Sequence, residues 1–222
     1  FLRQVRKLSE AALNPDPDAC RRAVDGLMRT GVTAVAVADD HIPAAARWIG
    51  EQWMQDEVTF ADVTISVSRL QTLLRSLDED LKPERLGISR QPRVLLLASH
   101  DNDHTLGAMV LLGQLRRQGC SVRLLLGARP DTLSEKIAGM HFDAVMISAA
   151  QGNRVETLRR LVLAVRRGGE DAPIVIGGTI VESEPELRRR TCADHAEKDL
   201  QRALKLCRLT GKLRQRHGNR ST

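Results

Sequence analysis

The chain is poor in aromatic residues and has no tyrosine. Of its 222 residues, two are tryptophan and three are phenylalanine. Modules that bind single-stranded nucleic acids stack bases on aromatic side chains, so this composition argues against that class of protein.

Cysteine motifs and long apolar runs are also missing. The four cysteines are widely scattered and form no CxxC pair, which argues against a zinc site or a disulfide framework and favours a reducing, cytoplasmic location. No apolar run reaches the roughly 18 residues of a membrane span, so we expect no membrane partner. Because the chain begins with Phe1, we expect a piece of a longer protein.

The first 80 residues have the hydrophobic period of helices. Apolar residues recur every three or four positions within four segments, 2–13, 18–31, 42–55 and 59–80. Four amphipathic helices of this length predict a small bundle over residues 1–80. In the fourth helix, the pattern places Phe60, Val63, Val67 and Leu70 on one face.

Residues 81–92 have the composition of a linker, and the hydrophobic rhythm changes after them. Four short apolar runs follow, at 93–99, 121–128, 143–150 and 173–178, with helical stretches between them. Continuous apolar runs are typical of strands buried on both faces. With a fifth short strand near 191–194 and a C-terminal helix, residues 93–222 are predicted to form an α/β domain with a doubly wound parallel five-stranded sheet.

The residues after these strands are the candidates for a binding site, because ligands bind beyond the carboxyl ends of parallel strands. His104 and Gly107 follow the first strand, Ser148 ends the third, and Gly177 and Gly178 end the fourth. An imidazole can ligate the metal of a tetrapyrrole. A hydroxyl can hydrogen-bond a ligand, and glycines let backbone approach it closely.

This pattern resembles the cobalamin-binding domain, whose signature is Asp-x-His-x-x-Gly, then Ser-x-Leu, then Gly-Gly. The resemblance implies a flavodoxin-like fold in which His104 is the metal ligand. The helical half resembles the bundle that caps this domain in methionine synthase and in cobalamin photoreceptors. That likeness implies that Trp53 faces the ligand.

A narrower resemblance covers residues 39–77, "DDHIPAAARWIGEQWMQDEVTFADVTISVSRLQTLLRSL". They are similar to the helical segment of the AppA/PpaA/AerR antirepressors, which release photosynthesis genes by binding the repressor PpsR or CrtJ. The resemblance implies a repressor of the PpsR/CrtJ type as partner and cobalamin or heme as cofactor. A chain that begins with Phe1 fits the longer, AppA-type member, which is described as a heme-sensing variant.

The chain departs from these patterns at several positions. Asn102 replaces the aspartate of the signature; it can orient His104 but adds no charge, unless Asp101 or Asp103 takes that place after a shift of the loop. Ala150 replaces the leucine. Val63-Thr64 stands where the photoreceptors have a Glu-His pair, which argues against adenosylcobalamin photochemistry.

Each site residue also has a structural interpretation. His104 belongs to an inherited loop if the cofactor has been lost, Ser148 is then a strand terminus, and Gly177-Gly178 is a tight turn. Three hypotheses follow: a tetrapyrrole sensor that docks on a repressor, a corrinoid carrier of a methyltransferase, and a cofactor-free docking scaffold. We expect the first, a regulatory domain without catalytic activity.

Other histidines, including His41, are expected on the surface or in loops, and Cys120 and Cys192 are expected to be buried. From Arg202 to Arg220 the chain has seven basic residues and no acidic one. This C-terminal tail is either a solvated helix end or a weak contact with DNA phosphates beside a bound repressor.

Overall fold

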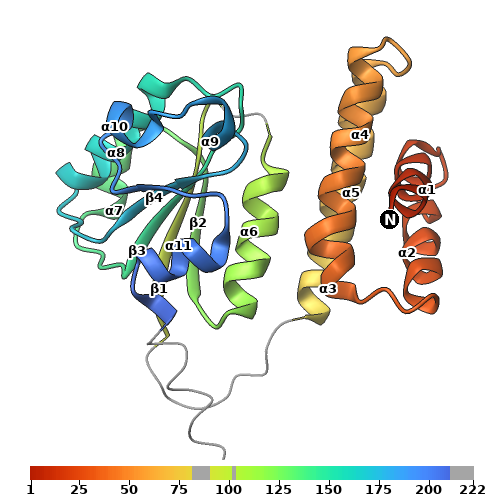
Figure 1. The fold of residues 1–222 in the computed structure, drawn as a ribbon, viewed down its shortest axis with the longest axis horizontal. Helices are drawn as coiled ribbons and strands as arrows, with labels where there is room; N and C mark the ends of the chain where they lie inside the picture. The colour runs from red at the N-terminus through yellow and green to blue at the C-terminus, as the bar shows by residue number, and fades with distance from the viewer. Residues whose placement is uncertain (82–90, 102–103, 211–222) are drawn as a thin grey trace, which may run out of the picture. The chain divides into compact units, whose positions relative to one another are not determined.

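The computed structural model describes residues 1–81, 91–101 and 104–210, and it divides into two compact units. The first, Phe1–Lys82, is called the helical unit here, and the second, Pro83–Thr222, is called the α/β unit (Figure 1). Most of the linker predicted at 81–92 lies outside the described residues, as does the part of the basic tail from residue 211 onward.

The helical unit contains the four predicted helices around a core of leucine and isoleucine. They are α1 (Leu2–Leu13), α2 (Ala19–Arg29), α4 (Ile42–Met54) and α5 (Phe60–Asp80). Side chains from three of them, Leu8, Ile49 and Leu74, are almost completely buried. At the start of α5, Thr59 and Asp62 form a reciprocal capping box that ends the preceding turn.

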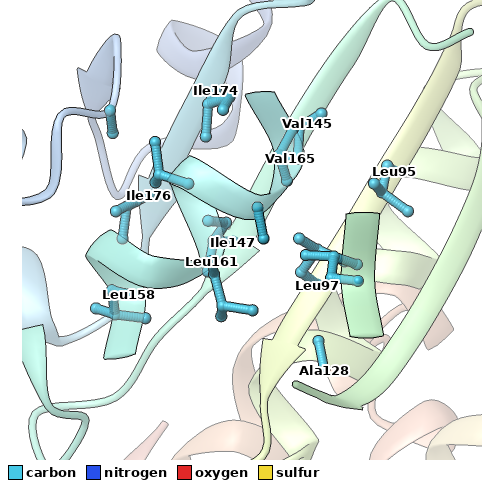
Figure 2. Packing of buried hydrophobic residues seen from close by; sticks show 14 of the residues in the cluster. Leu95, Leu97, Ala128, Val145, Ile147, Leu158, Leu161, Val165, Ile174 and Ile176 are labelled. Atoms are coloured by element: carbon cyan, nitrogen blue, oxygen red, sulfur yellow. The ribbon is translucent and has the colours of Figure 1, made fainter. Parts of the chain in front are cut away.

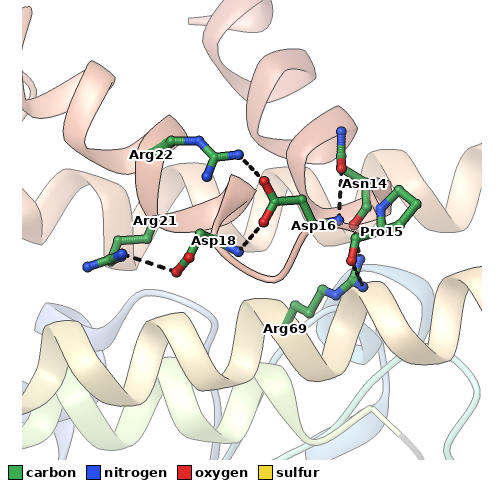
Figure 3. A network of polar contacts seen from close by, with 7 residues as sticks. All are labelled: Asn14, Pro15, Asp16, Asp18, Arg21, Arg22 and Arg69. Atoms are coloured by element: carbon green, nitrogen blue, oxygen red, sulfur yellow. Dashed lines mark hydrogen bonds and ion pairs between the residues drawn. The ribbon is translucent and has the colours of Figure 1, made fainter.

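Polar contacts hold the connection between α1 and α2 against α5. The Arg69 guanidinium of α5 donates to the carbonyl of Ala12 at 2.8 Å and also to that of Asn14. Asp16 of this connection pairs with Arg22 of α2 (Figure 3). The break at residues 14–18 is therefore an ordered turn.

Two features of the helical unit differ from the prediction. A short helix α3 (Ala34–Ala36) and a π-helix η1 (Val37–His41) precede α4, and they bury His41 instead of leaving it on the surface. Its Nδ1–H donates to the carbonyl of Ala36 at 2.9 Å. Phe60, predicted on the buried face of α5, is 70% exposed.

The α/β unit contains five parallel strands, which confirms the predicted fold class. They are β1 (Arg93–Ser99), β2 (Ser121–Ala128), β3 (Ala144–Ser148), β4 (Ile174–Gly177) and β5 (His195–Ala196). Their order in the sheet is β2-β1-β3-β4-β5, the flavodoxin-like order. The central strands are buried on both faces, but β2 is an edge strand and is partly exposed, although its apolar run predicts full burial.

Helices cover both faces of the sheet (Figure 1). On one face, α6 (Leu106–Arg117) and α11 (Leu200–Leu206) contribute to a single buried cluster. The other cluster contains side chains of α7 (Pro130–Ile137), α8 (Val155–Arg167), α9 (Ile180–Ser183) and α10 (Leu187–Thr191). Leu158, Leu161 and Val165 of α8 pack there against Ile147 of β3 (Figure 2).

All four cysteines are free thiols, and they differ in exposure. Cys20, Cys120 and Cys207 are buried, and burial raises the pKa of the Cys207 thiol to about 11. Cys192 is exposed, contrary to the expectation, because it ends α10 in a left-handed turn with φ of 61°. Within the described part of the chain, no helix is both long and apolar enough to cross a membrane.

Candidate functional site

The strand order brings three of the predicted motifs to one place. Between β1 and β3 the chain changes direction, so the loops after these two strands leave toward opposite faces of the sheet. Such a switch point leaves a crevice at the ends of the strands, here called the carboxyl edge. In the register of the sheet, Ser148 pairs with Ala98 of β1 on one side and with Gly177 of β4 on the other.

Gly107 and Ser148 face each other at this switch point. Gly107 is exposed in the first turn of α6, and a Cβ atom there would lie 3.7 Å from Ser148 Oγ. That is an ordinary contact distance, so packing does not require a glycine. The Ser148 hydroxyl is half-buried and has no hydrogen-bond partner among the described residues. A half-buried hydroxyl without a partner suits the polar group of a ligand.

Gly177 and Gly178 have a packing reason to be glycine. A Cβ atom at Gly177 would lie 2.8 Å from the carbonyl oxygen of Glu197, and one at Gly178 would lie 2.2 Å from that of Ala149. Gly178 also has φ of +103°, which side chains rarely tolerate. These contacts support the interpretation as a tight strand-to-helix turn.

His104 is exposed just before α6, which begins after Thr105. Asn102 and Asp103, two of the three candidate orienting residues, lie outside the described residues. No cluster of three or more metal-ligating side chains occurs in the described ranges. A tetrapyrrole needs no such cluster, because its ring nitrogens already hold the metal and one axial imidazole completes the site. An exposed single histidine therefore fits this group.

Asp101, which the sequence offered as an alternative orienting residue for His104, makes contacts that the sequence did not predict. Its Oδ1 accepts hydrogen bonds from Ser99 Oγ at 2.5 Å and from Asn153 Nδ2 at 3.0 Å. Partial burial alone would raise the pKa of the Asp101 carboxyl, but the hydrogen bonds from Ser99, Thr157 and Asn153 outweigh it and hold the pKa below its usual value. The Arg154 N–H acts in the same direction.

These contacts make Asp101 a brace between the loops on the two sides of the switch point. Asp101 follows β1, whereas Asn153 belongs to the loop between β3 and α8. Asn153 Oδ1 in turn accepts from the Ala150 N–H at 2.8 Å. A carboxylate two residues after a buried strand is the signal that marks this position in the sequence.

Trp53, predicted to face the ligand, lies at the end of α4 in the helical unit. It is 44% exposed, and its ring centroid lies 6.2 Å from that of Phe60. Trp48, one and a half turns earlier in α4, is half-buried.

Comparisons with known proteins match most of the chain. The model of the B12 binding domain matches residues 92–204. The chain is 38% identical over 165 residues to the uncharacterized 20.5 kDa protein of the bchF-crtJ intergenic region of Rhodobacter capsulatus, covering 74% of this chain and 86% of the relative.

A solved structure has the same fold. The monomethylamine corrinoid protein of Methanosarcina barkeri superposes with a TM-score of 0.66 at 14% identity, over 92% of this chain and 96% of that protein. These matches support the broader resemblance to the cobalamin-binding domain and do not single out an AppA-type or PpaA-type member. The chain belongs to the B12-binding domain family.

Proposed function

We propose that this chain is a cobalamin-responsive regulatory module that docks on a transcriptional repressor of the PpsR/CrtJ type and controls photosynthesis genes. The observation that carries the proposal is the combination of a B12-binding domain with a relative named for its place beside crtJ. CrtJ is the repressor that the resembled antirepressors bind.

The cofactor of this proposal is cobalamin, because the family match supports it and none of the comparisons supports heme. His104 would ligate the cobalt, Ser148 would donate a hydrogen bond to the ligand, and Gly107 would leave room for it. Bound cobalamin would supply a cobalt centre that responds to light, redox state or small molecules.

The signal passes through the two loops at the switch point. Ligation would fix the position of His104, three residues after Asp101. Asp101 transmits that constraint to Asn153 and the start of α8. Binding then shifts the population of loop conformations that the repressor recognises.

In this proposal the module has no reaction of its own. The second candidate is a corrinoid carrier for methyl transfer, favoured by the fold that the chain shares with a corrinoid protein. A carrier loaded with methylcobalamin demethylates when it is mixed with a methyltransferase and a thiol acceptor, whereas a sensor does not.

The direct test is an absorption titration of the chain with hydroxocobalamin and, separately, with heme. We expect a saturable spectral shift with hydroxocobalamin that is lost in His104→Ala. The matched control is His100→Ala, another exposed histidine of the same loop. Equal shifts in both variants, or none in the wild type, contradict the cofactor assignment and leave the scaffold hypothesis.

Repressor docking is tested by size-exclusion chromatography of the chain with purified CrtJ. We expect co-elution whose extent changes when cobalamin is added. Absence of co-elution in both conditions refutes the regulatory proposal even where cobalamin binds.

A further inference from the structure

The two units of the chain carry charge of opposite sign. The helical unit has 13 acidic and 10 basic residues, a net charge of −3, while the α/β unit has 15 acidic and 24 basic residues, a net charge of +9. The net positive charge of +6 therefore comes entirely from the α/β unit.

The α7–α8–α10 side of the sheet is mixed in charge. Several arginines there are paired with carboxylates: Arg159 with Glu156, Arg160 with Asp131, Arg189 with Glu186 and Arg190 with Glu184. Exposed pairs of this kind cancel most of the local field.

The α6–α11 side is different, because its two helical segments carry one sign of charge. Neither 106–117 nor 200–210 contains an acidic residue. The two segments carry five cations, here called the basic face: Arg116, Arg117, Arg202, Lys205 and Arg208. All except the half-buried Arg117 are exposed.

The two segments of the basic face belong to one surface. Leu115 of α6 and Leu204 of α11 lie in the same buried cluster, so both helices rest on the same side of the sheet. Arg202 and Lys205 are three residues apart, on successive turns of α11, so they project along one line about 4.5 Å apart along the axis. The nearest acidic residue in the chain, Asp199, caps α11 by accepting from the Arg202 N–H at 2.8 Å.

The chemistry of this face fits the phosphate backbone of double-stranded DNA. Clustered lysine and arginine neutralise phosphates and release counterions. The described part of the face has no aromatic side chain on which bases of a single strand would stack. Leu206 is its exposed large apolar residue, at 42%, which is too little for insertion into a membrane interface.

We propose that the α6–α11 face binds the backbone of duplex DNA without reading its sequence. This inference goes beyond the proposed function and does not depend on cobalamin or on a repressor. It assigns the contact to a folded surface that combines α6 with Arg202, Lys205 and Arg208, the first part of the basic segment singled out in the sequence.

The test compares two double variants that remove the same charge. Arg202→Ala/Lys205→Ala changes the basic face. Arg167→Ala/Arg188→Ala removes two exposed arginines from the opposite side that form no ion pair with the described residues. Binding of a fluorescent mixed-sequence duplex is followed by anisotropy at several salt concentrations, without cobalamin or repressor. Circular dichroism checks that both variants fold.

We expect the basic-face variant to lose roughly tenfold in affinity at low salt, and the slope of log K against log salt to shrink by up to about 1.8, which is about 0.9 for each lost phosphate contact. The opposite-face variant should change little. Equal losses in both variants would mean attraction by net charge alone and would overturn the proposal. Tighter binding to phosphatidylserine vesicles or to a single strand than to the duplex would also overturn it.

Discussion

The carboxyl edge of the sheet has two sides on which glycines serve different purposes. At the end of β4, positions 177 and 178 require glycine, because neighbouring carbonyl oxygens occupy the space that a Cβ atom would need. At the start of α6, Gly107 has no such requirement and faces the Ser148 hydroxyl, which has no hydrogen-bond partner in the described part of the chain. The glycines of one sequence signature thus have two different roles. Gly177 and Gly178 are needed for packing at the carboxyl edge, whereas Gly107 leaves the Ser148 hydroxyl accessible.

The largest effect on stability is expected for Gly178→Ala, which tests the packing of the turn after β4. A methyl group would enter the space of the Ala149 carbonyl on a backbone with φ of +103°. We expect a loss of about 3 kcal/mol or more in the free energy of unfolding. Urea unfolding followed by circular dichroism measures it, because both tryptophans lie in the helical unit and do not report on the sheet. A loss below about 1 kcal/mol would contradict the packing account.

An intermediate effect is expected for Asp101→Asn, which weakens the brace between the two sides. The free energy of unfolding at pH 7 should fall by about 1 kcal/mol, since the lost charge weakens the hydrogen bonds from Ser99 and Asn153. Asp25→Asn, at an exposed position on α2, is the control.

The effect of Asp101→Asn should depend on pH. The folded state holds the pKa of Asp101 below its unfolded value of about 3.9. The ionised carboxyl therefore stabilises the fold above that pH, and this contribution is lost as the pH falls through the folded pKa. The free energies of unfolding of wild type and variant should therefore converge below about pH 4. A difference that stays constant with pH would mean that the substitution acts through packing and not through the lost charge.

A small effect on stability is expected for Gly107→Ala, at the start of α6. Alanine in the first turn of α6 should leave the free energy of unfolding unchanged or raise it by about 0.5 kcal/mol. Hydroxocobalamin affinity should fall at least tenfold, because the methyl group covers the Ser148 hydroxyl at 3.7 Å. Isothermal titration calorimetry measures the affinity independently of the free energy of unfolding. An unchanged affinity would show that Gly107 is not part of the binding site.

The smallest effect on stability is expected for His104→Ala, since His104 is exposed. The free energy of unfolding should change by less than about 0.5 kcal/mol. Thermal unfolding with and without hydroxocobalamin should show ligand stabilisation in the wild type and its loss in the variant. A large change without ligand would make His104 a structural residue.

The fold was predictable because burial on both faces leaves a mark in the sequence. Val94 to Ala98 in β1 form such an apolar run, and the structure buries them completely. The run of β2 is similar, yet β2 lies at the edge of the sheet. Strand order is a tertiary property, and the composition of one strand does not encode it.

The site was predictable only in part, for a related reason. The positions of His104, Gly107 and Ser148 after their strands followed from the parallel sheet, whereas the brace formed by Asp101 depends on Asn153, 52 residues later. Burial of His41 escaped prediction because η1 winds with a wider turn than the 3.6-residue period assumes.

The single exposed thiol gives the molecule a natural attachment point for a reporter. Cys192 precedes β5 and so lies toward the amino ends of the parallel strands, opposite the carboxyl edge. A maleimide dye on Cys192 would lose fluorescence to a corrin absorbing at that edge without touching it. Occupancy could then be followed in real time while repressor and DNA are added.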